Sequence, residues 1–263
     1  MWGGINVFPG TCSDDLVRAF HDFTISPTPD PHAHVIASVV WSAATGMEAS
    51  VVGAYHTDSQ TLTAPPSVSP LTSLEPSYQS TLRKATLLEL TEEQSAFTAD
   101  AARQLFFTTT IKADLELLLK VIEFSRVALK TVQDAEGLSW TVIIQPMTTQ
   151  LLKKSEEAGE NSLGLSSGDG PLVNVLVNPT WGAASDDDRI VAASMEVITK
   201  TDEEAAKMGK AAKYRFMNYG HKTQDIFQGV GEERLAKMRE VSRKYDPKRF
   251  FQTNFVGGFK IGS

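Results

Sequence analysis

The chain has 263 residues, of which 41% are hydrophobic and 22% charged, a balance typical of a soluble globular protein. Its formal net charge is −7 and its lysines and arginines are scattered, which argues against nucleic acid or an anionic membrane as a partner. One cysteine, Cys12, excludes an intramolecular disulfide, and the start of the chain lacks the basic and apolar regions of a signal peptide. We therefore expect a cytoplasmic protein.

Hydrophobic periodicity predicts alternating helices and strands in the first half of the chain. Ser13 is a suitable N-cap for a helix with an apolar stripe, and Asp114 can open what we expect to be the longest helix. The proline-rich stretch 57–78 is expected to be a long surface loop. The other expected elements are strands at 34–41, 49–55 and 106–112 and a helix at 86–96.

The second half continues this alternation. Gly137 ends the long helix, and Asp186, Asp187 and Asp188 precede a later helix, whose N-terminus they stabilise through its dipole. The remaining expected elements are strands at 140–147 and 172–180, a short helix near Leu151, a glycine- and serine-rich run at 159–170 and a helix at 190–210. Four or more strands, with helices long enough to cover one face of a sheet, predict an α+β fold.

Familiar catalytic and nucleotide-binding motifs are absent from the sequence. The run from Gly164 to Gly170 lacks the lysine and the following helix of a phosphate-binding loop. His32 and His34 share one face of an extended segment, but two imidazoles without a third ligand do not indicate a metal site. We expect no metal.

Amide side chains on two predicted strands mark a candidate ligand-binding face. Asn174 and Asn178 point to one side of their strand, and the valines that alternate with them should bury against helices. Gln145 interrupts another apolar strand. Such groups can orient a ligand in a mostly apolar pocket, or the face can simply be hydrated, and the pattern favours neither.

The last fifty residues contain three characteristic runs: Tyr214-Arg215-Phe216-Met217-Asn218-Tyr219, Tyr245-Asp246-Pro247 and Gly257-Gly258-Phe259-Lys260. In this order they resemble the C-terminal end of the berberine bridge enzyme-like FAD-linked oxidases, especially the fungal ones. Further matches in the same order cover nearly the whole chain, among them Trp2-Gly3-Gly4, Asp30-Pro31-His32-Ala33, Gly137-Leu138-Ser139-Trp140 and Gly159-Glu160-Asn161-Ser162-Leu163-Gly164-Leu165.

The resemblance implies the substrate domain of that family, a broad antiparallel sheet backed by helices with its open face towards the flavin. It divides the chain into a substrate-binding-like domain at 1–212 and a C-terminal segment at 213–263 packed on it. Asn218 and Tyr219 match family residues that lie beside the cofactor, whereas Phe216 replaces a tyrosine.

The candidate site residues follow from both lines of argument. We expect Tyr214 and Tyr219 as hydrogen-bond donors in catalysis and His221 as an acid or base. The expected substrate-binding residues are the amides Gln145, Asn174, Asn178 and Asn218, with Trp41 and Trp140 as apolar walls.

The family's glycine-rich pyrophosphate-binding segment and its flavin-linking His and Cys are absent from this sequence. We therefore expect no cofactor, with FAD present only if a partner chain supplies it. The leading hypothesis is an FAD-independent cyclase or isomerase of fungal specialised metabolism acting on a polyketide- or terpenoid-like intermediate. The alternatives are a fragment or split half of an FAD-dependent oxidoreductase, and a non-catalytic ligand carrier or pseudoenzyme. A homodimer or a partner chain could cover the face of the sheet that meets the flavin domain in the family.

Overall fold

The computed structural model describes residues 1–58, 60–96, 103–159 and 162–262. Within them, ten strands form one sheet in which every strand pair is antiparallel. The strands are β1 (Trp2–Pro9), β2 (Ala33–Ser42), β3 (Met47–His56), β4 (Gln79–Ser80), β5 (Arg83–Lys84), β6 (Arg103–Gln104), β7 (Phe107–Lys112), β8 (Ser139–Met147), β9 (Leu172–Val177) and β10 (Thr180–Trp181). The predicted α+β fold with a broad antiparallel sheet is confirmed.

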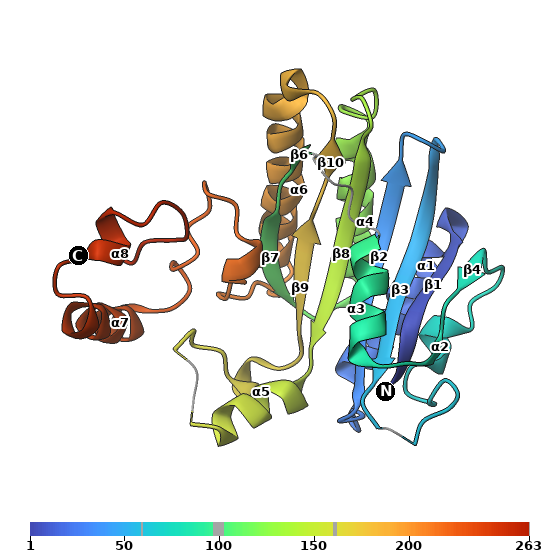
Figure 1. Ribbon diagram of the computed structural model, residues 1–263, viewed down its shortest axis with the longest axis horizontal. Helices are drawn as coiled ribbons and strands as arrows, with labels where there is room; N and C mark the ends of the chain where they lie inside the picture. The colour runs from blue at the N-terminus through green and yellow to red at the C-terminus, as the bar shows by residue number, and fades with distance from the viewer. Residues whose placement is uncertain (59, 97–102, 160–161, 263) are drawn as a thin grey trace.

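The long helices cover one face of this sheet. Figure 1 shows α1, α4 and α6 behind the strands and α3 in front of them. The helices are α1 (Ser13–Ile25), α2 (Ser69–Thr72), α3 (Leu87–Ala96), α4 (Leu115–Leu129), α5 (Thr149–Glu157), α6 (Asp187–Lys207), α7 (Glu232–Tyr245) and α8 (Phe250–Thr253). Among these helices of the described residues, none has the length and apolar composition needed to cross a bilayer.

Strand alternation separates a core face from an open face. Along β8, the buried residues Trp140, Val142 and Ile144 face the helices, and the half-buried residues between them face away. On β9 the predicted valine face lies in the same core, where Val175 pairs with Ile144 and Val177 with Val142. The opposite face of β8 and β9 is the open face, and no long helix covers it at these strands (Figure 1).

Two expectations about elements need correction, and one strand was not predicted. The stretch 57–78 is not only a surface loop, because it contains α2 and buries Val68 and Leu71 completely. The longest helix is α6, with 21 residues against 15 for α4. The first residues form β1, an inner strand between β3 and the short strands β4 and β5, whose glycines hid its strand character.

One glycine of β1 is required by the packing of the open face. A Cβ on Gly3 would lie 2.8 Å from Cδ1 of Tyr55 on β3, so the tyrosine ring can lie flat on the sheet only above a residue without a side chain. The Tyr55 hydroxyl accepts a hydrogen bond from Gln94 of α3 at 2.8 Å. This contact holds α3 against the open face.

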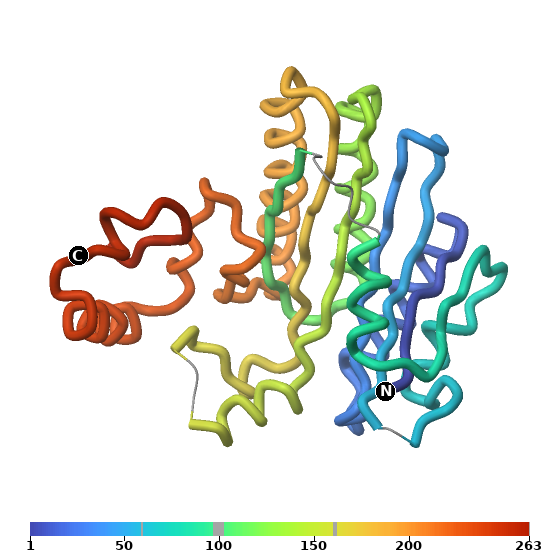
Figure 2. The backbone as a smooth tube through the Cα atoms, in the orientation of Figure 1, coloured from blue at the N-terminus to red at the C-terminus, as the bar shows by residue number. Residues whose placement is uncertain are grey.

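The C-terminal segment leaves the sheet in two stages. Residues that follow Tyr214 first contact the outer edge of β7, where Arg215 donates to the Thr108 carbonyl at 2.9 Å. The chain then continues into α7 and α8, which stand to one side of the sheet (Figure 2). The division of the chain at 212 and 213 remains a prediction.

Candidate functional site

A chain of polar side chains crosses three strands on the open face. Register places Gln145 of β8 opposite Asn174 of β9, and Asn174 opposite Thr110 of β7. The Thr108 hydroxyl donates to Oδ1 of Asn174 at 2.8 Å, and Nδ2 of Asn174 donates to Oε1 of Gln145 at 3.4 Å. Nε2 of Gln145 in turn donates to the hydroxyl oxygen of Tyr219 at 3.1 Å.

The direction of these bonds determines whether the Tyr219 hydroxyl can donate a hydrogen bond to a ligand. Since its hydroxyl oxygen accepts from Gln145, its own O–H remains available as a donor. No acceptor for that proton lies among the described residues. The network therefore presents a neutral O–H donor at the end of a hydrogen-bonded chain anchored in the sheet.

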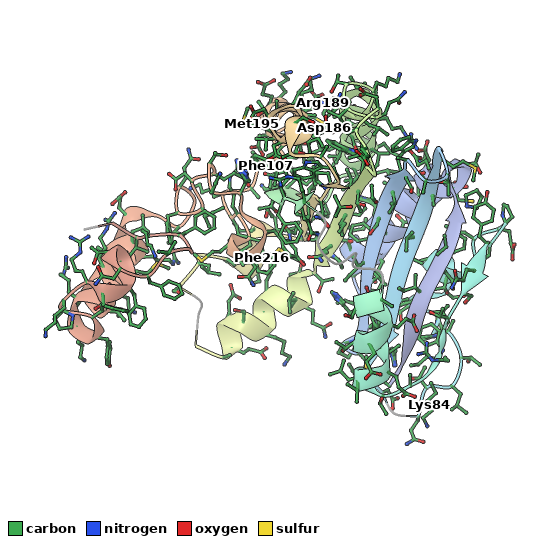
Figure 3. All side chains as sticks on the ribbon, turned by 45° about the horizontal axis from the view of Figure 1, so that its top comes forward. Lys84, Phe107, Asp186, Arg189, Met195 and Phe216 are labelled. Carbon is green, nitrogen blue, oxygen red and sulfur yellow. The ribbon has the colours of Figure 1, made fainter. Side chains whose placement is uncertain are left out.

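Aromatic rings hold Tyr219 in place. Phe216 meets the Tyr219 ring edge-on at a centroid distance of 4.8 Å, and Phe106 does so at 5.5 Å. Figure 3 labels Phe216 on the side of the sheet that carries β7 and the C-terminal segment. The hydroxyl missing from Phe216 is thus replaced by an apolar contact, and the surroundings of Tyr219 are mostly apolar.

At the outer edge of β7, side chains bond the backbone groups that a neighbouring strand would otherwise pair. Oε1 of Gln224 accepts from the Thr108 backbone N–H at 3.1 Å, and its Nε2 donates to the Thr108 carbonyl at 2.8 Å. Arg215 bonds the same carbonyl and forms an ion pair with Asp202 of α6. These contacts attach the segment that carries Tyr219 to both the sheet and a helix.

The structure thus brings together three of the predicted site residues, Gln145, Asn174 and Tyr219. It adds Thr108, which sequence reasoning did not select, although the two-residue period of the strand 106–112 puts Thr108 and Thr110 on one face. Asn174 is buried, and its amide bonds Thr108 and Gln145, so the choice between a ligand-binding face and a hydrated face stays open.

Other predicted residues lie apart from this network. Asn178 is half-buried and donates from Nδ2 to the Leu105 carbonyl at 3.0 Å, a bond that holds the chain just before β7. Asn218 is exposed and has no hydrogen-bond partner within the described residues. Tyr214 is buried, which raises its pKa to about 12, and it lines an adjoining groove described below.

His221 lies on the other side of the β7 edge. Its ring stacks on Phe107, a core residue, at a centroid distance of 4.2 Å, and its Nδ1 lies 2.8 Å from the Thr223 hydroxyl. Burial and the neighbouring Lys222 lower the pKa of His221 below its usual value. The ring is therefore neutral at neutral pH, and the acid or base role expected for it remains a prediction.

The two predicted aromatic walls lie on the helix-covered face. Trp140 is buried, and its indole N–H donates to the Ser125 hydroxyl on α4 at 2.8 Å. Trp41 pairs with Trp140 across β2 and β8 and packs against the same core. Neither ring is brought to the face that carries Tyr219. Glu160 and Asn161 of the glycine-rich motif lie outside the described residues.

No protein-family model matches the chain. Among curated proteins, it is 29% identical over 273 residues to the FAD-dependent monooxygenase tpcD of Cochliobolus heterostrophus, a match that covers 99% of this chain and 52% of that protein. Further fungal relatives also carry the name FAD-dependent monooxygenase. The chain spans about half the length of the curated relatives it matches.

Solved structures show the same half-length match. 6-Hydroxy-D-nicotine oxidase from Arthrobacter nicotinovorans superposes with a TM-score of 0.67 and 13% identity, over 97% of this chain and 54% of the oxidase. A berberine bridge enzyme-like protein from Physcomitrella patens superposes with a TM-score of 0.63 and 11% identity, over 100% of this chain and 54% of that protein. The fold is that of the substrate domain of FAD-linked oxidases.

These comparisons overturn the expectation that no cofactor is used. The relatives are named FAD-dependent, and the oxidases share the fold, so the findings point to FAD rather than to no cofactor. The expectation was wrong because it was drawn from motifs missing in this chain, and a chain that matches half of its relatives says nothing about motifs in their other half. The relatives and structural neighbours are enzymes; cyclisation and isomerisation remain untested.

The network is chemically suited to part of FAD. The isoalloxazine ring is planar and uncharged when oxidised and carries carbonyl acceptors, which match the Tyr219 O–H and its aromatic surroundings. The four side chains of the network include no cation, so they do not suit the pyrophosphate. The open face fits the ring system or an aromatic substrate lying against it.

Proposed function

We propose that the chain forms the substrate-binding half of an FAD-dependent oxidoreductase of specialised metabolism. The observation that carries the proposal is the Thr108–Asn174–Gln145–Tyr219 network on the open face. It is supported by the likeness to fungal FAD-dependent monooxygenases over 99% of the chain.

In this proposal, FAD would supply two-electron redox chemistry when bound. Tyr219 donates a hydrogen bond to a carbonyl or hydroxyl oxygen of the bound ring system, and Gln145 holds the tyrosine in the orientation that makes this possible. Phe106 and Phe216 exclude water from the bond, which strengthens it. The substrate class is a mostly apolar molecule with a few oxygen atoms, because apolar side chains such as Ile143 and Leu176 adjoin the network on the open face.

The test is a flavin titration of the purified protein, together with any chain that copurifies with it. We expect visible absorption bands of oxidised flavin, present at purification or restored by added FAD, which bleach on reduction. A Gln145→Leu variant should weaken FAD or substrate binding, whereas Gln133→Leu, at an exposed turn after α4, should not. A colourless protein that is indifferent to saturating FAD would contradict the proposal.

A further inference from the structure

A groove lies between the sheet and the C-terminal segment, and it adjoins the open-face network through Thr110, which pairs with Asn174, and through Leu172. Its volume is about 760 Å³, within the range of ~300–1,000 Å³ usual for small-molecule sites. Its walls come from the ends of β7 and β9, from the loop around Gly164 and from the segment 211–234.

Positive charge is in excess in this groove. Lys112, Lys213 and Arg234 line it, and none of the three is in an ion pair with another described residue. Of the two acidic residues in the walls, Asp202 is paired with Arg215, and Asp169 accepts from the Ser166 backbone N–H at 3.0 Å in a capping box. Asp169 keeps its negative charge, but four cations face two carboxylates in the lining, so the groove has a net positive charge.

Arg234 reaches the opposite wall. Its Nη1 lies 3.5 Å from the point where a Cβ of Gly164 would stand, and its Cδ lies 3.6 Å from that point. Gly164 has a φ of +79°, a conformation that side chains rarely adopt, so the backbone favours glycine there. The guanidinium thus spans the space between α7 and the loop around Gly164.

Tyr214 supplies a hydroxyl donor that is free to bind a ligand. The residue is only 9% exposed and lines the groove, and its hydroxyl has no hydrogen bond within the described residues. Burial raises the pKa of Tyr214 to about 12, so the hydroxyl is neutral and able to donate at neutral pH. The hydroxyl oxygen is not among the fully buried polar atoms that lack a partner, so it is accessible to a ligand in the groove, whereas the hydroxyl of Thr110, which also lines the groove, is fully buried without a partner in the described residues.

Apolar groups make up much of the remaining wall. Leu172 and Val230 are buried and line the groove together with Leu163 and Leu165. A ligand that satisfies both parts of the groove has an anionic group and an apolar body.

We propose that this groove binds a small organic anion, with its carboxylate or phosphate held by Lys213, Arg234 and the Tyr214 hydroxyl and its apolar body against Leu172 and Val230. The site adjoins the open-face network but shares none of its four side chains, and anion binding there is measured without flavin, so the proposal does not depend on the proposed oxidoreductase function. A carboxylate comes from an organic acid, whereas a phosphate comes from a nucleotide or phosphate ester. Both use the same charge-assisted hydrogen bonds.

The test is calorimetric titration of the purified protein with decanoate, ADP and inorganic phosphate. We expect saturable binding of decanoate or ADP that weakens as salt is added, and the probe that binds identifies the source of the anion. Lys213→Gln combined with Arg234→Gln should raise the Kd by about tenfold or more, and Tyr214→Phe by roughly threefold.

Lys237→Gln is the matched control, since Lys237 is an exposed cation on the same helix and does not line the groove. Lys213 and Arg234 are also exposed, so their variants should keep the wild-type thermal midpoint. The proposal is overturned if neither organic anion binds, if inorganic phosphate binds as tightly as both, or if Lys237→Gln weakens binding as much as the double variant does.

Discussion

At the residue scale, the important feature is the orientation of a single hydroxyl. Tyr219 accepts from Gln145, which leaves its proton for a ligand, and Asn174 and Thr108 fix the amide of Gln145 in turn. In each of these bonds the donor and the acceptor are therefore determined by the neighbouring side chain of the network. A hydroxyl held in this way loses little entropy when it binds a ligand oxygen.

Replacing Tyr219 by phenylalanine should slow turnover of the flavin-loaded protein by about 10²-fold, because one preorganised donor to the reacting ring system is lost. The edge-to-face contacts with Phe106 and Phe216 remain, so the thermal midpoint should change little. Steady-state kinetics measure the effect, and Tyr78→Phe, at a tyrosine that is 62% exposed, is the control. Unchanged turnover would remove Tyr219 from the reaction.

At the element scale, the backbone groups on the outer edge of β7 are bonded by side chains of the C-terminal segment, at Arg215 and Gln224. An unpaired edge exposes backbone N–H and C=O groups that must find partners. Here Gln224 satisfies both groups of Thr108, and Arg215 adds a second bond to the carbonyl. The site segment is thus anchored by backbone bonds of a strand 116 residues away.

Gln224→Ala should lower the free energy of unfolding by about 1–3 kcal/mol, because it leaves the Thr108 N–H without its partner in a half-buried position. Denaturant unfolding measures the loss, and hydrogen exchange at the Thr108 amide should become faster. Gln228→Ala, at an exposed position four residues later, should be near neutral. Equal effects of the two substitutions would show that the edge contact contributes nothing specific.

At the scale of the whole molecule, two parts of the chain differ in how far their apolar side chains are buried. We call the sheet with α1, α4 and α6 the sheet domain, and α7, α8 and the residues after them the C-terminal arm. The sheet domain has a continuous core from α1 to α6. On α8 and just after it, by contrast, Phe250, Phe251 and Phe255 are 52%, 60% and 55% exposed. Figure 2 shows that this part of the chain stands to one side of the sheet. Clusters of exposed aromatic rings mark surfaces that bind other groups or cause association.

We expect the purified chain to bind a hydrophobic dye such as ANS at this arm. A triple variant with serine at 250, 251 and 255 should bind less dye while keeping the thermal midpoint of the sheet domain, because these rings contribute nothing to its core. Fluorescence titration and thermal unfolding provide the two readouts. Tyr245→Ser, at an isolated exposed ring on α7, is the control, and an equal loss of dye binding there would contradict the assignment.

The sequence by itself determined those strands and helices that a hydrophobic repeat within one segment of the chain predicts. The alternation of Asn174 with the neighbouring valines predicts two faces of β9, and burial of the valines confirms it, because side-chain direction in a strand depends only on parity. The family resemblance likewise predicts the antiparallel sheet, because motifs that occur in the same order over most of the chain indicate that the chain has the family's fold. It could not establish the cofactor, because the relatives extend beyond the half that this chain matches.

Only the tertiary structure decided which of these residues meet. Trp140 and Gln145 lie on one strand five residues apart, and this odd spacing puts them on opposite faces of the sheet. Trp140 therefore packs against the helices, where it bonds Ser125 of α4. Tyr214 and Tyr219 belong to one motif, yet Tyr219 bonds Gln145 in the network whereas Tyr214 lines the adjoining groove. Contacts across 74 residues, such as that between Gln145 and Tyr219, depend on strand order and chain path, which local patterns do not contain.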